Sequence, residues 1–185
     1  MTRVSFYEDL PSATEIIVWK QRVDESLGER EGVIVNLVAN QQAPPDFVGL
    51  TPAEVRAHFD DLRDEADRVA CLSLLAAAEA VLRIDYLKHV YGRSKDAVGR
   101  VFRTIHKEKD VKARLSDDLL KTWVGEHSGA KVAVSEFRGA LKFRDWLAHG
   151  RYWTPKLGQW YTMEDIVRLG DNLFKALPTV EGWPD

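Results

Sequence analysis

Cysteine is almost absent from this chain: Cys71 is the only one among 185 residues. A lone cysteine has no partner for a disulfide within the chain, which fits a reducing compartment. No apolar run approaches the roughly 20 residues that span a bilayer. The first residues, MTRVSFYEDLPSATE, also lack the basic-then-apolar order of a signal peptide. These absences predict a cytoplasmic protein that has no membrane partner.

Motifs for metals and cofactors are missing as well. The five histidines are scattered, and Cys71 has no second ligand near it in the sequence. The chain has neither a phosphate-binding loop of the P-loop kind nor a Gly-x-Ser-x-Gly turn. The sequence therefore predicts no metal site and no cofactor.

Strand patterning is nearly absent too, whereas helical spacing recurs along the chain. Ser12 and Glu15 have the spacing of a capping box at a helix start. After Gly28 and Gly32, the segment GVIVNLVAN is compatible with a second helix or a short strand. Thr51, followed by proline and then by glutamate at the third helical position, predicts another helix start.

The second part of the chain is more regularly helical. A long apolar pattern runs from about residue 59 to 91 and ends at Gly92, and later helices are expected over SKDAVGRVFRTIHKEK, SDDLLKTWVGEH and AVSEFRGALKFRDWLAH. A last helix, TMEDIVRLGDNLFKAL, begins at a Thr162 cap and stops before Pro178. We therefore expect an all-α bundle over residues 51–185, with residues 1–50 as a small N-terminal extension, helical or mixed, that packs on it.

Charge is divided unevenly along the chain. Residues 1–92 carry a net charge of −7 and residues 93–185 a net charge of +4. Residues 93–114 hold eight lysines and arginines against three acidic residues. Such a segment can attract phosphates. It can equally be a solvated helix face.

The stretch FRDWLAHGRYW, residues 143–153, places Arg144, Asp145 and His149 in an otherwise largely apolar and aromatic run. On a helix, Asp145 and His149 share one polar stripe, whereas Arg144 lies on the apolar arc. An arginine there needs an anionic partner, because a buried unpaired charge costs several kcal/mol. Asp145 and His149 are four residues apart, so they can form a hydrogen bond that suits the histidine to general-base work.

A structural interpretation of the same residues stays open. Arg144 can pair with a carboxylate of the bundle such as Glu79, which is also spaced to pair with Arg83. Gly150 is expected just past the helix end, where His149 can interact with the helix dipole.

Arg144-Asp145-Trp146-Leu147-Ala148-His149 resembles the Arg-x4-His signature of the HEPN superfamily, helical-bundle proteins of which many are ribonucleases. Asp145 fits the second position of that signature, and the resemblance covers about residues 59–177. It implies a HEPN-like bundle that cleaves RNA without a metal. His149 would transfer a proton, Arg144 would stabilise the charged phosphorane, and Asp145 and Glu79 would support them.

The resemblance also implies partners. HEPN motifs usually meet around a cleft shared by two subunits, so a homodimer is expected. Some members are toxins or defence proteins opposed by an antitoxin protein, which modifies a tyrosine two residues after the histidine. Here Tyr152 stands three residues after His149, which departs from that pattern. The rival interpretation is a non-catalytic HEPN domain that binds RNA, a nucleotide or a protein.

The segment that follows, GRYWTPKLGQWY, mixes cations with aromatic side chains. Aromatic rings can stack on unpaired bases while cations hold phosphate. This pattern predicts RNA contacts from Arg151, Tyr152, Trp153 and Lys156. The alternative is a turn whose tryptophans, Trp153 and Trp160, cover the end of the bundle.

Overall fold

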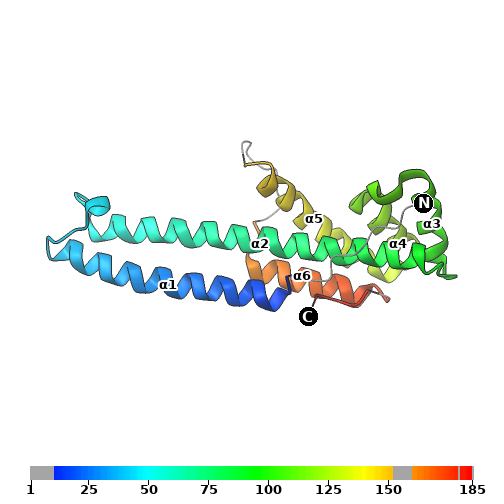
Figure 1. Ribbon diagram of the computed structural model, residues 1–185, viewed down its shortest axis with the longest axis horizontal. Coiled ribbons are helices and arrows are strands. Elements are labelled where there is room, and N and C mark those ends of the chain that lie inside the picture. Colours follow the sequence, from blue (N-terminus) through cyan, green and yellow to red (C-terminus); the bar gives the residue numbers. More distant parts are fainter. Residues whose placement is uncertain (1–10, 152–159, 179, 185) are drawn as a thin grey trace. The chain divides into compact units, whose positions relative to one another are not determined.

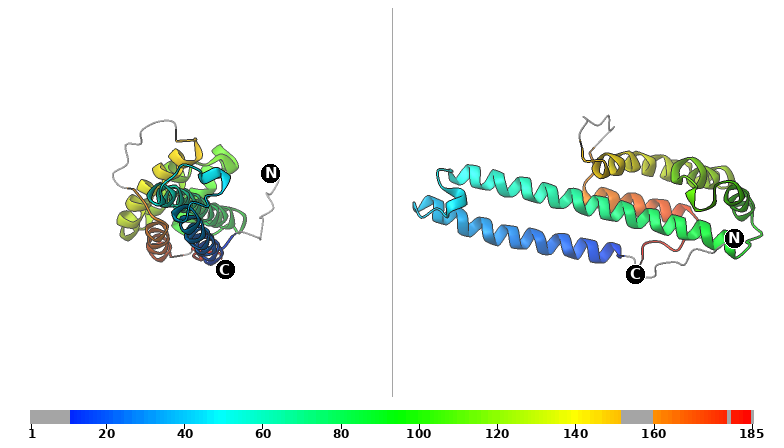
Figure 2. Two further views of the ribbon diagram at one scale, coloured as in Figure 1. Left: turned by 90° about the vertical axis from the view of Figure 1, so that its left-hand side faces the viewer. Right: turned by 45° about the horizontal axis from the view of Figure 1, so that its top comes forward.

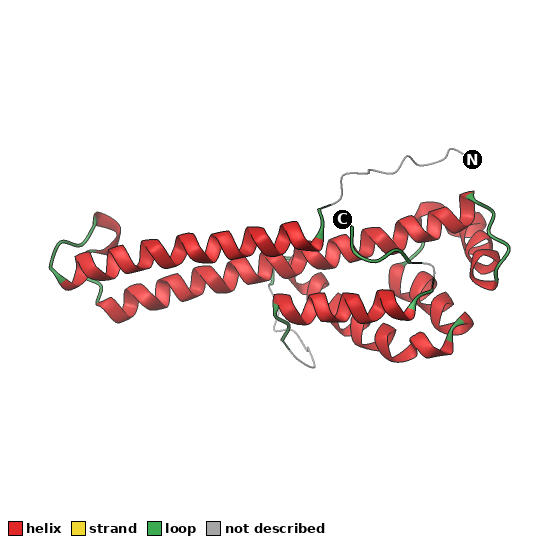
Figure 3. Cartoon of the chain, turned by 90° about the horizontal axis from the view of Figure 1, so that it is seen from below, coloured by secondary structure: helices red, strands yellow, loops and turns green. Residues whose placement is uncertain are grey.

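The computed structural model describes residues 11–151, 160–178 and 180–184. Within these ranges all regular structure is helical and no strand occurs, which confirms the predicted all-α class (Figure 3). The α-helices are α1 (Ala13–Ala39), α2 (Pro52–Tyr91), α3 (Ala97–Lys109), α4 (Leu120–Glu126), α5 (Lys131–Ala148) and α6 (Met163–Ala176) (Figure 1). The short elements are the 3-10 turns η1 (Pro45–Phe47), η2 (Asp110–Lys112) and η4 (Ser128–Ala130), and the π-helical turn η3 (Leu115–Leu119).

Helix α1 is continuous, so the interruption predicted at Gly28 and Gly32 is wrong. Each glycine costs a helix only about 1 kcal/mol relative to alanine. Packing offsets that cost, because Ile34, beyond both glycines, is buried against Phe47 and Phe59. The segment GVIVNLVAN therefore continues the helix and forms neither a separate helix nor a strand.

Helix α2 begins where the sequence predicts. The Thr51 backbone N–H donates to the Glu54 carboxylate at 2.7 Å, and the Glu54 N–H donates to the Thr51 hydroxyl at 3.3 Å. These reciprocal bonds form the capping box, with Pro52 at the first helical position. The helix then runs for 40 residues to Tyr91. It ends as predicted at Gly92, whose N–H donates to the Lys88 carbonyl at 2.9 Å.

The chain divides into two compact units, and the division falls within α2, after Ala70. One unit, residues 14–70, is an antiparallel pair formed by α1 and the first half of α2 (Figure 2). Its core contains Ile34, Phe47, Val55 and Phe59. The expectation that residues 1–50 form an extension to a bundle stays a prediction.

The other unit combines residues 71–91 of α2 with α3 to α6. Its largest fully buried side chains are Leu74, Leu75, Leu82, Tyr86, Phe102, Leu119, Leu120, Trp123, Phe137, Phe143, Ile166 and Leu173. Helix α6 starts at the predicted Thr162 cap, whose hydroxyl accepts the Asp165 N–H at 3.3 Å. This unit holds every described residue of the candidate site.

Candidate functional site

Helix α5 carries both residues of the Arg-x4-His pattern. Its apolar face, including Phe137, Phe143 and Trp146, is buried in the core of the unit. The helix ends at His149, whose backbone N–H donates to the Asp145 carbonyl at 3.0 Å. Gly150 follows with φ +79°, in the left-handed region that glycine enters without strain.

The helix end is closed by one further backbone bond. The Arg151 N–H donates to the Trp146 carbonyl at 3.2 Å, which is, of the two bonds of a Schellman motif around Gly150, the one with the longer span in sequence. This confirms the prediction that Gly150 lies just past the helix. His149 is exposed there, at the C-terminal end of α5.

Arg144 is held by two carboxylates. Its Nη1 forms an ion pair with Glu79 of α2, and its Nη2 and Nε donate to one oxygen of Asp145, at 2.7 Å and 3.1 Å. The Arg144 and Glu79 side chains are only 22% and 19% exposed, whereas Asp145 is 54% exposed. The anionic partner expected for Arg144 is therefore present, and it is the Glu79 named among the structural alternatives.

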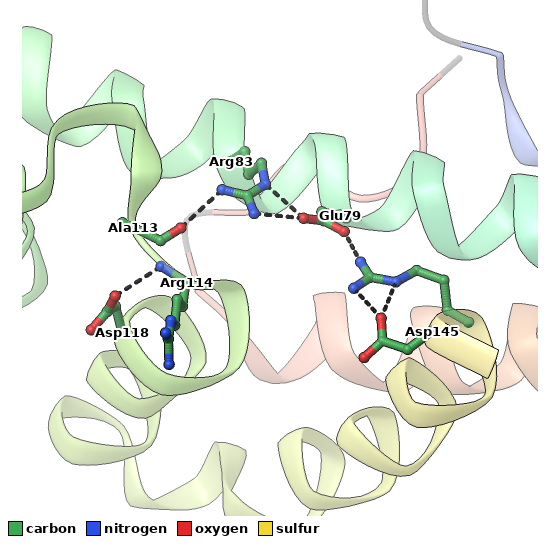
Figure 4. A network of polar contacts seen from close by, with 7 residues as sticks. Glu79, Arg83, Ala113, Arg114, Asp118 and Asp145 are labelled. Atoms are coloured by element: carbon green, nitrogen blue, oxygen red, sulfur yellow. Dashed lines mark hydrogen bonds and ion pairs between the residues drawn. The ribbon is translucent and has the colours of Figure 1, made fainter. Parts of the chain in front are cut away.

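Glu79 also holds a second guanidinium (Figure 4). Arg83 approaches its Oε1 with Nε and Nη2, both at 2.7 Å, and donates from Nη1 to the Ala113 carbonyl at 3.0 Å. Burial lowers the pKa of Arg83 from its ordinary value. Two arginines and two carboxylates thus form one charge-balanced chain that links α5, α2 and the segment before η3.

Residues 113–118, which run from that segment into η3, are held by three hydrogen bonds. Besides the bond from Arg83, the Ser116 carbonyl accepts from Arg138 of α5 at 2.6 Å. The Arg114 N–H donates to the Asp118 carboxylate at 2.8 Å (Figure 4). Sequence reasoning missed the role of Asp118, because the expected helix SDDLLKTWVGEH gives no sign of the π-helical turn at Leu115–Leu119.

Aromatic side chains gather beside the end of α5. The ring of Trp160 lies across Trp146 at a centroid distance of 5.2 Å and across Phe143 at 6.1 Å. Trp160 is still 63% exposed, whereas Tyr161 is buried. Trp160 therefore packs on the end of α5, as the alternative of a turn that covers the bundle predicted for this tryptophan. It still keeps most of its surface exposed.

The remaining predicted site residues divide into two groups. Arg151 is exposed directly after α5, with φ +56°. Tyr152, Trp153 and Lys156 lie outside the described residues. The expected bond between the Asp145 carboxylate and the His149 ring stays a prediction.

Two other histidines, which the sequence analysis did not single out, are buried in the same unit. His89 Nδ1 lies 3.4 Å from the Asp85 carboxylate, and its Nε2 lies 3.8 Å from that of Asp96. The hydrogen bond to Asp85 raises the pKa of His89 above its ordinary value. His106 Nδ1 lies 3.1 Å from the Tyr86 hydroxyl. Because both rings are buried, they differ from His149, which solvent can reach.

Comparison with protein families, with curated proteins and with solved structures found no match to this chain. Over the described ranges, no group of three or more His, Cys, Asp or Glu side chains is arranged to hold a metal ion. No helix in the same ranges is both long and apolar enough to cross a membrane. The functional assignment therefore depends on the chemistry of α5 and its neighbours.

Proposed function

We propose that this chain is a metal-independent endoribonuclease of the HEPN type. The observation that carries the proposal is the last part of α5, where a partly buried Arg144 precedes an exposed His149 at the helix end. A guanidinium binds a phosphate through paired N–H donors. An exposed imidazole can exchange protons near neutral pH. Together they supply the two groups that RNA cleavage needs when its own 2′-hydroxyl is the nucleophile.

The reaction follows from these two groups. His149 takes the proton of the 2′-hydroxyl, and the oxygen attacks the adjacent phosphorus. Arg144 stabilises the extra negative charge on the phosphorane. The bond from phosphorus to the 5′-oxygen then breaks, and that oxygen takes up a proton. That proton comes from solvent, so the products are a 2′,3′-cyclic phosphate and a 5′-hydroxyl. His149 then releases the proton that it took from the 2′-hydroxyl to solvent, which restores the base.

Asp145 has a defined part in this proposal. It occupies the Nε and Nη2 edge of Arg144, which is the edge that a phosphate would take with two parallel bonds. Being about half exposed, Asp145 can give way to a bound phosphate, whereas Glu79 keeps hold of Nη1. Asp145 would then be free to orient the His149 ring. Glu79 and Asp145 are thus positioning residues rather than catalytic ones.

The same proposal includes assembly and partners. In a two-fold symmetric homodimer the same surface of each subunit meets its copy. If that surface includes the end of α5, the two α5 ends would line one RNA cleft. In this proposal the exposed Arg151 would add a phosphate contact and the exposed face of Trp160 a base contact. A toxin or defence role, with an antitoxin protein that restrains cleavage, belongs to this proposal.

A second candidate is a non-catalytic HEPN-type domain that binds RNA, a nucleotide or a protein. The observation that favours it is the charge balance at Arg144, whose guanidinium already meets two carboxylates. Such pairing is sufficient to explain an arginine among apolar side chains without any substrate. The two candidates differ in one outcome, since only the first cuts RNA.

The test is cleavage of a 3′-labelled single-stranded RNA by the purified chain in excess EDTA. We expect cutting to continue, with 2′,3′-cyclic phosphate and 5′-hydroxyl ends. A single 2′-deoxy nucleotide at the scissile position should block it. Binding without any cutting would favour the second candidate. Products with 5′-phosphates, or activity that needs added magnesium, would overturn the mechanism.

A further inference from the structure

A second feature of the unit lies at the start of α3, apart from Arg144 and His149. Residues 93–107 contain five cations and a single acidic residue, Asp96. The cations are Arg93, Lys95, Arg100, Arg103 and Lys107, which we call the basic surface. Three of them lie on α3 at spacings of three and four residues, so they share one ridge of the helix.

The ridge faces away from the core. The opposite part of α3, with Val98, Phe102 and His106, is buried. Arg100 and Lys107 are exposed, and Arg103 is half-buried between them. The cations of α3 are therefore directed to the surface by the packing of the helix.

The loop that precedes α3 adds the other two cations to the same place. Arg100 donates from Nη1 to the Lys95 carbonyl at 2.9 Å, and Arg103 donates from Nη1 to the Ser94 carbonyl. Both guanidinium groups thus lie against the loop that carries Arg93 and Lys95, which are exposed. Each of these two arginines uses one of its five N–H donors in a hydrogen bond to a carbonyl, so the other donors remain available to an anion.

Asp96 does not neutralise this surface. Its carboxylate accepts the Gly99 N–H at 2.6 Å as the N-cap of α3, and it also accepts the Ser94 hydroxyl. These bonds lower the pKa of Asp96, with the one from Ser94 as the largest cause. The carboxylate is thereby held at the helix start, and with five cations against this one acid, residues 93–107 keep a net charge of +4.

The adjoining residues 109–118 offer a contrast, because two of their cations form ion pairs with carboxylates of the same chain. Lys109 pairs with Asp118 at 2.6 Å, and Arg114 pairs with Asp117 at 3.5 Å. Over the described part of the chain, none of the five cations of the basic surface forms an ion pair with a carboxylate. Clustered like charges repel one another, and a bound polyanion would relieve that repulsion.

We infer that the basic surface binds the phosphate backbone of the RNA strand, at a place separate from the cleavage residues. The choice of RNA rests on the proposed function. A row of cations with uneven spacing fits a flexible chain of phosphates, and several such contacts make binding strongly salt-dependent. The one aromatic ring within residues 93–107 other than histidine, Phe102, is buried, so the surface offers no platform for bases. Binding here is therefore independent of base sequence.

The test measures binding separately from cutting. The probe is a fluorescent 2′-O-methyl RNA of 20 nucleotides, which lacks the nucleophile and stays intact. The variant is the triple substitution Arg93→Ala, Lys95→Ala and Lys107→Ala, which removes three cations whose described side chains form no hydrogen bond or ion pair. The matched control removes the exposed Lys121, Lys131 and Lys175 of the same unit.

We expect the triple variant to lose about tenfold or more in affinity, and the slope of log affinity against log salt to fall by about two. The control triple should keep both within experimental scatter. Equal losses in the two triples, an unchanged salt slope, or binding to phosphatidylserine vesicles in place of RNA would overturn the inference.

Failure of the basic surface to bind RNA can be distinguished from failure of the proposed cleavage activity. If the wild type binds the probe through this surface but never cuts unmodified RNA, the cleavage proposal fails and the basic surface stands. If the wild type cuts RNA while the triple variant binds as tightly as the wild type, only the basic surface fails.

Discussion

Two arginines, one in each unit, are held in the same way. Arg63 forms an ion pair with Glu31 of α1 and donates to Asp60 at 2.9 Å. Arg144 pairs with Glu79 of α2 and donates to Asp145 at 2.7 Å. The two arginine side chains are similarly covered, at 28% and 22% exposure. An arginine between two carboxylates is therefore an arrangement that occurs in both units.

What surrounds the two arginines is different. Arg63 lies in the first third of α2, and the ring centroid of the nearest histidine on its helix, His58, is 5.7 Å from that of Phe47. Arg144 lies in the last turns of α5, ahead of an exposed histidine at the helix end. Pairing alone therefore identifies no functional site. The chemistry that we propose depends on the histidine and on an arginine edge that Asp145 can vacate.

The largest expected effect separates the two arginines by activity. Arg144→Ala should reduce RNA cleavage by about 10²-fold or more, because it removes the group that stabilises the transition-state charge. Arg63→Ala should leave the rate within about twofold of the wild type, since it changes only packing and pairing. Initial rates on a labelled RNA measure both. Equal losses in the two variants would mean that Arg144 acts through stability alone.

The second effect concerns the carboxylates. Glu79→Gln leaves two guanidinium groups, those of Arg83 and Arg144, without their shared counter-charge, so it should lower the free energy of unfolding by about 2–3 kcal/mol. Glu31→Gln leaves Arg63 with its bond to Asp60 and should cost about 1 kcal/mol. Urea unfolding followed by circular dichroism compares the two. A larger loss for Glu31→Gln would show that the network around Glu79 is not the tighter one.

The smallest effect extends the comparison to a histidine that is buried more deeply than either arginine. The carboxylates of Asp85 and Asp96 face His89, whose pKa is raised, first by its hydrogen bond to Asp85. A raised pKa means that the charged ring stabilises the fold below its ordinary pKa of 6.5, and that this contribution is lost as the pH rises through the folded value. Wild type and His89→Gln should therefore differ more in unfolding free energy at pH 5.5 than at pH 9. A difference that grows with pH would contradict the assignment.

Local signals in the sequence predicted the helix ends well. Thr51 and Thr162 cap their helices as expected, and each forms a capping box, which involves only residues three apart. Gly150 ends α5 for an equally local reason, its positive φ. The prediction for Gly28 and Gly32 was wrong, because burial of Ile34 comes from residues distant in sequence.

The candidate site was predictable in part. The position of Arg144 on the apolar arc required an anion, and Glu79 was among the named carboxylates. The bond from Arg144 to its neighbour Asp145 was not foreseen, because adjacent helical residues point about 100° apart and only a long arginine can fold back. The anchoring of Arg100 and Arg103 on the loop before α3 depends on a turn that no spacing rule describes.

The most direct test of the central claim compares two exposed histidines, one in each unit. His149→Gln and His58→Gln make the same chemical change, at the end of α5 and in α2. Cleavage of a single-stranded RNA in excess EDTA, measured at one protein concentration for both variants, reports their effects. The account predicts that His149→Gln loses about 10²-fold or more in rate while His58→Gln keeps nearly all of it. Full activity in purified, folded His149→Gln would contradict it.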